Sequence, residues 1–133
     1  MIAIVSRPIA PEEVINSVRT PESGGVIVYT GLIRDNSRGK AVQSVTYSDP
    51  QGQARESLEA IAGRIKSRFP VNDVAICHRI GQLKVGEINI VVAVAAAHRQ
   101  EGFAACMYAI DQFKENLPTH KVEAYTDGST YSH

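Results

Sequence analysis

The amino-acid sequence predicts an α+β fold, a two-layer sandwich in which helices pack on one largely antiparallel sheet. From Gly24 onward, segments of strand and helix character follow each other in the order β-β-α-β-β-α-β. The chain has 133 residues, of which 44% are hydrophobic and 21% charged, as in ordinary globular domains. This length is enough for one ordinary core, so we expect a single domain that spans residues 1–133.

Local sequence patterns predict the individual elements. Ile2–Val5 suits a short strand, and a helix is expected from Pro11 because proline fits the first turn of a helix. Apolar residues recur three and four positions apart in Ala54–Phe69, which predicts a helix that Pro70 ends. The remaining predicted elements are strands at Val26–Ile33, Val42–Tyr47, Val74–Ile80, Ile88–Ala97 and His120–Tyr125, and a helix at Gln100–Leu117.

Three further expectations concern how these elements pack. Val26–Ile33 and Val42–Tyr47 are expected to pair as an antiparallel hairpin around the polar turn Arg34–Lys40. The polar segment Asp127–His133 is expected to be mobile. The last helix is expected to place its larger apolar residues on one face, namely Phe103, Met107, Ile110, Phe113 and Leu117.

Composition limits the classes of function. The formal net charge is zero, so no bulk field draws the chain to nucleic acid or to an anionic membrane. The N-terminus lacks a basic leader and a cleavage site. The longest nearly uncharged run, Ile88–Ala97, is far shorter than the ~20 residues of a membrane helix. We therefore expect a cytoplasmic protein that neither spans a membrane nor binds nucleic acid.

No cofactor or metal site is predicted. Cys77 and Cys106 lie in apolar stretches, which favours small buried hydrophobes in a reducing compartment over a disulfide or a catalytic thiol. The four histidines show no paired ligand spacing, and there is no glycine-rich phosphate loop. His78 and Arg79 interrupt an apolar strand, where an edge or outer face is the favoured position for them.

The junction Ala95–Arg99 is the first candidate site. An apolar strand ends there in His98 and Arg99 just as a helical pattern begins. A half-solvated polar pair at a helix start is one interpretation, and it is about as well supported as the other. In the other, the unpaired N–H groups of the helix start, an arginine fork and an imidazole together bind an oxyanion or a phosphate.

Three more basic residues are candidates. Arg34 ends a predicted strand and could point into a cleft, although a solvated charged turn is the more common reason for such a residue. Lys114 and Lys121 lie on either side of Pro118 and are weak signals individually. If they converge, mutual repulsion or burial would lower a lysine pKa toward the range that is useful for proton transfer.

Together these stretches resemble the large, catalytic subunit of molybdopterin synthase. The similarity rests on GGVIVYTGLIRDNSRGKAV, on the run from RIKSRFP through AHRQEGF to KENLP, and on KVEA, and it covers most of the chain from Gly24 to Ala124. Its most specific parts are TGLIRD, HRIGQLKVGE and AHR. The resemblance implies an α/β hammerhead fold and a homodimer.

The resemblance also implies a reaction and a partner. In this family a small ubiquitin-like sulfur-carrier subunit docks on each protomer of the homodimer, which gives a heterotetramer. The C-terminal Gly-Gly thiocarboxylate of the carrier enters a pocket of the large subunit. Its sulfur is transferred, twice, to cyclic pyranopterin monophosphate to form the dithiolene of molybdopterin. The chain would then be a sulfurtransferase of molybdenum cofactor biosynthesis.

The family motifs assign roles to five residues of this sequence. Arg34, His98 and Arg99 match the groups that hold the pterin phosphate, partly across the dimer interface. Lys114 and Lys121 match the two lysines assigned to catalysis and to the carrier terminus, so we expect them to transfer protons and orient the thiocarboxylate. Cations are what a thiocarboxylate, a cyclic phosphate and a developing anion all require.

The sequence departs from the family pattern in three places. TYSDPQGQA replaces an acidic and aromatic stretch, His120 stands where an aromatic residue is usual, and the tail reads TDGSTYSH, with Tyr131 in the position of a tryptophan. Two other functions stay open, of which these changes motivate the first. One is a divergent, non-catalytic paralogue that binds the pterin precursor or the carrier without turnover. The other is a generic metabolite sensor.

Overall fold

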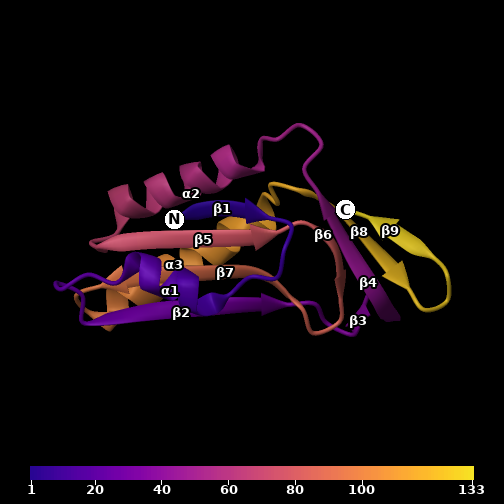
Figure 1. Ribbon diagram of the computed structural model, residues 1–133, viewed down its shortest axis with the longest axis horizontal. Helices are drawn as coiled ribbons and strands as arrows, with labels where there is room; N and C mark the ends of the chain where they lie inside the picture. Colours follow the sequence, from indigo (N-terminus) through magenta and orange to yellow (C-terminus); the bar gives the residue numbers. More distant parts are fainter.

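The computed structural model describes all residues, Met1–His133, as two β-sheets side by side, with three helices packed on the first sheet (Figure 1). The strands of the first sheet are β1 (Ile2–Val5), β2 (Gly25–Leu32), β5 (Asp73–Arg79) and β7 (Ile88–Ala96), in the order β1-β5-β7-β2. Only β1 and β5 are parallel. The α+β class is therefore confirmed, with one parallel pair in a largely antiparallel sheet.

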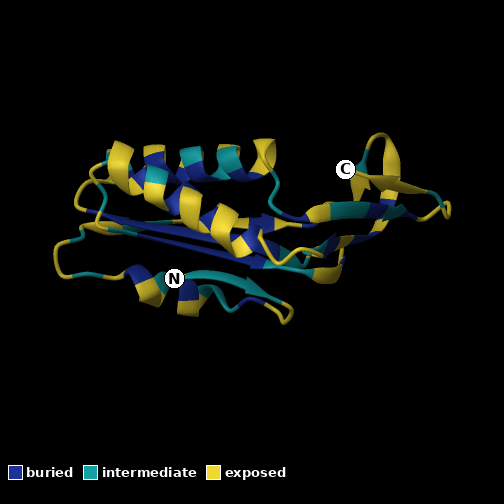
Figure 2. Cartoon of the chain, turned by 90° about the horizontal axis from the view of Figure 1, so that it is seen from above, coloured by how far each residue is buried: buried dark blue, intermediate teal, exposed yellow.

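Helices cover both faces of the first sheet (Figure 2). The helices α2 (Ala54–Arg68) and α3 (Arg99–Glu115) lie on one face, and α1 (Pro11–Val18) lies on the other. Every residue of β7 after Ile88 is buried, because β7 is an inner strand with helices on both sides. None of the three helices is long and apolar enough to cross a membrane.

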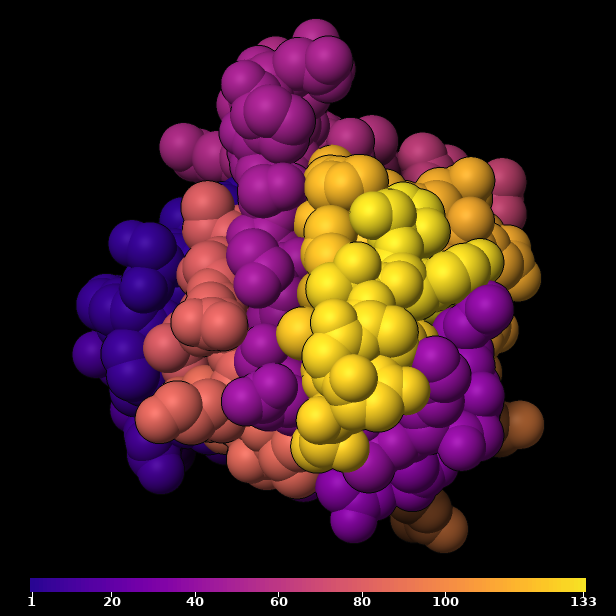
Figure 3. Space-filling view, turned by 90° about the vertical axis from the view of Figure 1, so that its right-hand side faces the viewer, coloured from indigo at the N-terminus to yellow at the C-terminus, as the bar shows by residue number.

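The second sheet has five strands and its own small core. Four of them, β3 (Asn36–Ser37), β4 (Lys40–Ser48), β8 (His120–Tyr125) and β9 (Thr130–Ser132), follow this order across the sheet. The fifth, β6 (Gly81–Lys84), pairs with β4. Figure 3 looks onto this sheet, and the yellow C-terminal residues lie in the middle of that face. The buried residues of the core are Ile33, Val42, Val45, Tyr47, Leu83 and Tyr125.

The prediction that Val26–Ile33 and Val42–Tyr47 pair with each other as a hairpin is wrong. β2 pairs along its length with β7, from Gly25 opposite Ala96 to Leu32 opposite Ile88. β4 lies in the other sheet, between β8 and β6. The polar turn forms the short strand β3, which folds back on the start of β4. β2 therefore finds its partner in the most apolar strand of the chain and not in its neighbour along the sequence.

The expectation of a mobile tail is also wrong. Residues Thr130–Ser132 form β9 and pair with β8. Lys40 holds the turn before β9, with its Nζ 3.3 Å from Asp127 Oδ2 and 2.9 Å from Ser129 Oγ. The Arg38 guanidinium lies 3.5 Å from the centre of the Tyr131 ring. The polar residues that suggested mobility are the ones that attach the tail to the β3–β4 turn.

The buried face of α3 also differs from the expected one. Phe103 and Met107 are 58% and 61% exposed, whereas Phe113 is buried. Small residues face the sheet instead, and a Cβ on Gly102 would lie only 2.9 Å from Ile27. This close approach leaves no room for large side chains at the start of the helix. The residues of α3 that are buried are Gly102, Ala105, Cys106, Ala109 and Phe113.

Candidate functional site

A cavity of about 710 Å³ lies where the two sheets meet. Four basic side chains line it: Arg34 after β2, Lys114 on α3, Lys121 on β8 and His133 after β9. The rest of the wall is apolar or neutral, and no aspartate or glutamate belongs to it. The structure thus brings three of the five predicted site residues together in a cavity that suits an anion. The remaining lining residues are Tyr29, Gly31, Leu32, Asn89, Ile90, Ile110, Phe113 and Leu117.

The cations of this cavity have few partners within the chain. Arg34 and Lys114 are exposed and take part in no ion pair or side-chain hydrogen bond. Lys121 is half-buried, and its Nζ lies 4.0 Å from Glu123 Oε1, the outer limit of an ion pair. Their N–H donors are therefore available to a bound anion, since charged donors bind oxyanions more strongly than neutral donors.

Behind Lys121 lies a buried carboxylate that sequence reasoning did not identify. Glu123 is 2% exposed and accepts hydrogen bonds from Tyr125 at 3.1 Å and from His133 at 2.5 Å. Burial raises the pKa of Glu123, but hydrogen bonds from Ser37, His133 and Tyr125, together with the charge of Lys121, lower it by more. Glu123 is therefore held as an anion beside Lys121. Its position two residues from Lys121 on one strand face was a usable signal.

A buried polar network joins the two sheets directly behind the cavity. His78 is fully buried on β5, which corrects the expected edge or outer face. Its Nδ1 lies 2.8 Å from the Asn89 carbonyl and therefore carries the proton, so Nε2 accepts from Thr119 Oγ1 at 2.9 Å. Asn89 Nδ2 donates to the Tyr47 hydroxyl on β4 at 2.9 Å. We call Tyr47, His78, Asn89 and Thr119 the bridging network.

Burial lowers the pKa of His78, while the hydrogen bond to Asn89 and the charge of Asp49 oppose this shift. The imidazole also packs edge-on against Tyr47 and Phe113, with ring centres 4.9 and 5.0 Å apart. His78 is therefore a neutral structural residue that supports the wall of the cavity, not a group that reaches a ligand.

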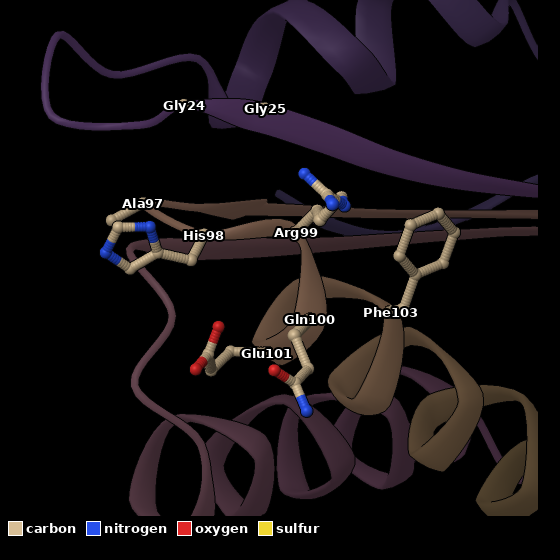
Figure 4. Close-up of a pocket in the computed structure, with 8 residues that line it drawn as sticks. All are labelled: Gly24, Gly25, Ala97, His98, Arg99, Gln100, Glu101 and Phe103. Atoms are coloured by element: carbon tan, nitrogen blue, oxygen red, sulfur yellow. The ribbon is translucent and has the colours of Figure 1, made fainter.

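His98 and Arg99 lie in a second pocket, of about 840 Å³, at the N-terminus of α3 (Figure 4). His98 precedes the first helical residue and makes no side-chain capping bond, so the N–H groups of the first turn are available to a ligand. In Figure 4 the Arg99 side chain extends toward the start of β2 at Gly24 and Gly25. The His98 side chain points in another direction, away from Arg99. Both side chains are exposed.

The two pockets lie at opposite ends of the paired strands β2 and β7. Gly25 lies opposite Ala96 at the end near His98, and Leu32 lies opposite Ile88 at the end near Arg34. The seven residue steps from Gly25 to Leu32, at about 3.3 Å each, separate these ends by roughly 23 Å. A single chain therefore does not bring His98 and Arg99 into contact with the Arg34 cavity.

The cysteines take no part in either pocket. Cys77 and Cys106 are both buried and unpaired. Burial raises the pKa of Cys77, and it raises the pKa of Cys106 to about 11. Both thiols are therefore protonated at neutral pH and poor nucleophiles, so the interpretation as small hydrophobes holds. No group of three or more His, Cys, Asp or Glu side chains is placed to hold a metal ion.

Sequence comparison relates this arrangement to known proteins. The family model of the MoaE protein matches residues 4–116. The molybdopterin synthase catalytic subunit of a Nostoc species is 42% identical over 129 residues, which make up 96% of this chain and 78% of that protein.

Solved structures share the fold along nearly the whole chain. Molybdopterin synthase from Staphylococcus aureus superposes with a TM-score of 0.90 and is 30% identical, covering 98% of this chain and 94% of that one. A protein-protein complex of subunits 1 and 2 of the molybdopterin-converting factor from Helicobacter pylori contains a chain with a TM-score of 0.77. That chain is 14% identical, over 99% of this chain and 90% of that one, so its similarity concerns the fold.

Proposed function

The chain belongs to the MoaE protein family, and from this membership we propose that it is the catalytic subunit of a cytoplasmic molybdopterin synthase. In the proposed reaction it transfers sulfur from the C-terminal Gly-Gly thiocarboxylate of a small ubiquitin-like carrier subunit. The acceptor is cyclic pyranopterin monophosphate, and two transfers give the dithiolene of molybdopterin.

The observation that carries this proposal is the cavity with four basic side chains and no acidic one. A thiocarboxylate and a cyclic phosphate are both anions, and their binding requires donors that the protein itself does not satisfy. Lys114 and Lys121 would orient the thiocarboxylate and transfer protons, and Arg34 would hold the phosphate. The apolar part of the wall suits a flat pterin ring.

A second copy of the chain would complete the site with His98 and Arg99. β2 is the outer strand of the first sheet, and Val28 and Leu32 on it are exposed, as are Phe103 and Met107 on the adjacent helix. An uncovered edge with exposed apolar residues favours association with a partner. Most homodimers have twofold symmetry, so two β2 edges would run antiparallel.

That antiparallel arrangement has a direct consequence for the site. The start of one β2, beside His98 and Arg99, would lie next to the end of the partner's β2, beside Arg34. The basic groups that lie far apart within one protomer would then face each other between protomers. We propose a homodimer on this basis, and a heterotetramer once a carrier subunit binds to each protomer.

An in vitro conversion assay tests the proposed function. Purified chain, thiocarboxylated carrier and cyclic pyranopterin monophosphate should yield molybdopterin, and Lys114→Ala or Lys121→Ala should lower the rate about a hundredfold or more. Lys66→Ala is the matched control, because Lys66 is an exposed lysine on α2 that pairs with Asp73 away from the cavity. Undiminished product from both cavity variants would contradict the assigned roles.

The same assay separates the enzyme from a non-catalytic paralogue. The altered tail and His120 are the features that favour the paralogue. Calorimetry that detects binding of carrier and precursor, together with no product after long incubation of the wild type, would support that alternative and reject turnover.

A further inference from the structure

Four side chains on neighbouring strands form a cluster beside the cavity. The β8–β9 register places Glu123 opposite Tyr131, and the His133 amide donates to the Lys121 carbonyl at 2.8 Å, which extends the same ladder by one pair. Residues two apart on a strand share a face, so Lys121, Glu123, Tyr131 and His133 project from the same side. His133 and Glu123 are diagonal neighbours, within reach of long side chains.

Two basic groups in this cluster face the same carboxylate oxygen. His133 Nε2 lies 2.5 Å from Glu123 Oε1, and Lys121 Nζ lies 4.0 Å from that atom. The other oxygen, Oε2, already accepts from Tyr125. Because His133 occupies Oε1, Lys121 is left without a close partner although a buried carboxylate lies next to it.

We propose that His133 is a positioning residue, which by binding Glu123 keeps the Lys121 ammonium directed into the cavity. This inference rests on the proposed function of Lys121. Without the imidazole, Lys121 is the nearest cation to Oε1 and would turn to form a direct ion pair with Glu123. A lysine held in that way is withdrawn from a thiocarboxylate or a phosphate in the cavity.

The rest of the tail holds the imidazole in place. The rings of His133 and Tyr131 meet edge to face, with their centres 4.8 Å apart. Arg38 covers the Tyr131 ring, and Lys40 holds the preceding turn through Asp127 and Ser129. The other charged residues of the cavity wall, Arg34 and Lys114, are both basic. The wall therefore offers no second carboxylate that could replace Glu123 as the partner of Lys121.

The test is a double-mutant cycle in the conversion assay. We expect His133→Ala to lower kcat about tenfold with little change in the KM for the carrier, because it misdirects one catalytic lysine. In a Glu123→Gln background the same substitution should cost less than about twofold, since no carboxylate remains to attract Lys121. Ser132→Ala is the matched control on β9 and should behave as the wild type.

Two results would overturn the proposal. One is wild-type turnover by His133→Ala. The other is an equal loss in both backgrounds, which is what a purely structural role of the tail predicts.

A crystal structure of His133→Ala gives a readout that does not depend on activity. We expect Lys121 Nζ to move to about 3 Å from Glu123 Oε1, the distance of a hydrogen-bonded ion pair. An unchanged separation would reject the proposal. If the wild type makes no molybdopterin, the proposed function fails, while this distance still decides whether His133 controls Lys121.

Discussion

At the scale of single residues, His78 links stability to pH. Its pKa in the folded protein is held below that of an exposed histidine, so the unfolded chain binds the proton more readily. Stability is therefore complete above about pH 6.5 and falls as the pH drops through that value. Urea unfolding between pH 7.5 and 5.5 should show a free energy of unfolding that falls toward acid pH, with a slope no steeper than about 1.4 kcal/mol per pH unit, the limit for one proton.

The matched variant is His78→Gln, which keeps hydrogen-bonding groups but does not titrate in this range. We expect it to be less stable at pH 7.5 and to lose the slope. The carboxylates with lowered pKa values, such as Glu123, titrate below about pH 4.5 and so do not contribute to the slope between pH 7.5 and 5.5. The same slope in the variant and the wild type would show that another group causes it.

The thiols provide a second expectation at this scale. Both cysteines are buried, and burial raises the pKa of Cys77 and Cys106. We expect neither to react with a thiol reagent such as DTNB at pH 8 in the folded protein, and both to react in denaturant. Absorbance of the released thiolate measures this, and fast stoichiometric reaction of the native protein would contradict the burial.

Sequence reasoning at the residue scale identified three of the four basic side chains of the cavity but not their surroundings. Arg34, Lys114 and Lys121 were found because family motifs and local position mark them. Glu123 and His133 were missed as site residues, because their contact depends on the pairing of β8 with β9. No local pattern in a polar tail predicts that register, so the carboxylate beside Lys121 became visible only in the structure.

At the scale of elements, the exposed face of α3 and the free edge of β2 support the proposal that this chain forms a dimer. Phe103 and Met107 lie four residues apart on one face of α3 and are mostly exposed. We expect Phe103→Glu with Met107→Glu to shift the protein from dimer to monomer mass in light scattering. A carboxylate in an apolar interface costs several kcal/mol.

Val85→Glu is the control for this change, because Val85 is an exposed apolar residue after β6 in the second sheet. It should leave the mass unchanged. A wild type that is monomeric at micromolar concentration, or a double variant that stays dimeric, would reject this face as the interface.

The boundaries of most elements follow from local patterns, whereas strand pairing does not. The apolar period of α2 and the apolar run of β7 were sufficient to predict both elements. The hairpin of β2 and β4 was not correct, because the true partner of β2 lies more than fifty residues further along the chain. Pairing depends on which apolar strands meet in the folded core, and that is a property of the whole chain.

At the scale of the whole molecule, the separation of the two pockets allows a complementation experiment. Arg99→Ala and Lys121→Ala should each abolish most activity as homodimers. When the two variants are mixed and exchange subunits, half of the dimers are mixed and carry one intact site of two. We therefore expect about a quarter of the wild-type rate to return.

The outcome distinguishes two arrangements of the site. If Arg99 acts within its own protomer, every site in a mixed dimer carries a defect and no activity returns. Two variants of the same pocket, Lys114→Ala with Lys121→Ala, form the control pair. Lys114 and Lys121 line the same cavity of one protomer, so every site in a mixed dimer of this pair carries one defect. We therefore expect no activity to return in the control.

The bridging network connects the two sheets through hydrogen bonds among Tyr47, His78, Asn89 and Thr119. Arg34 and Lys114 belong to the first sheet and its helix, and Lys121 and His133 to the second sheet. The spacing between these cations is therefore decided by the angle between the sheets. Hydrogen bonds within a buried polar network favour one orientation of the groups that they join. The relative placement of the cations thus depends in part on His78 and Thr119, which lie outside the cavity lining.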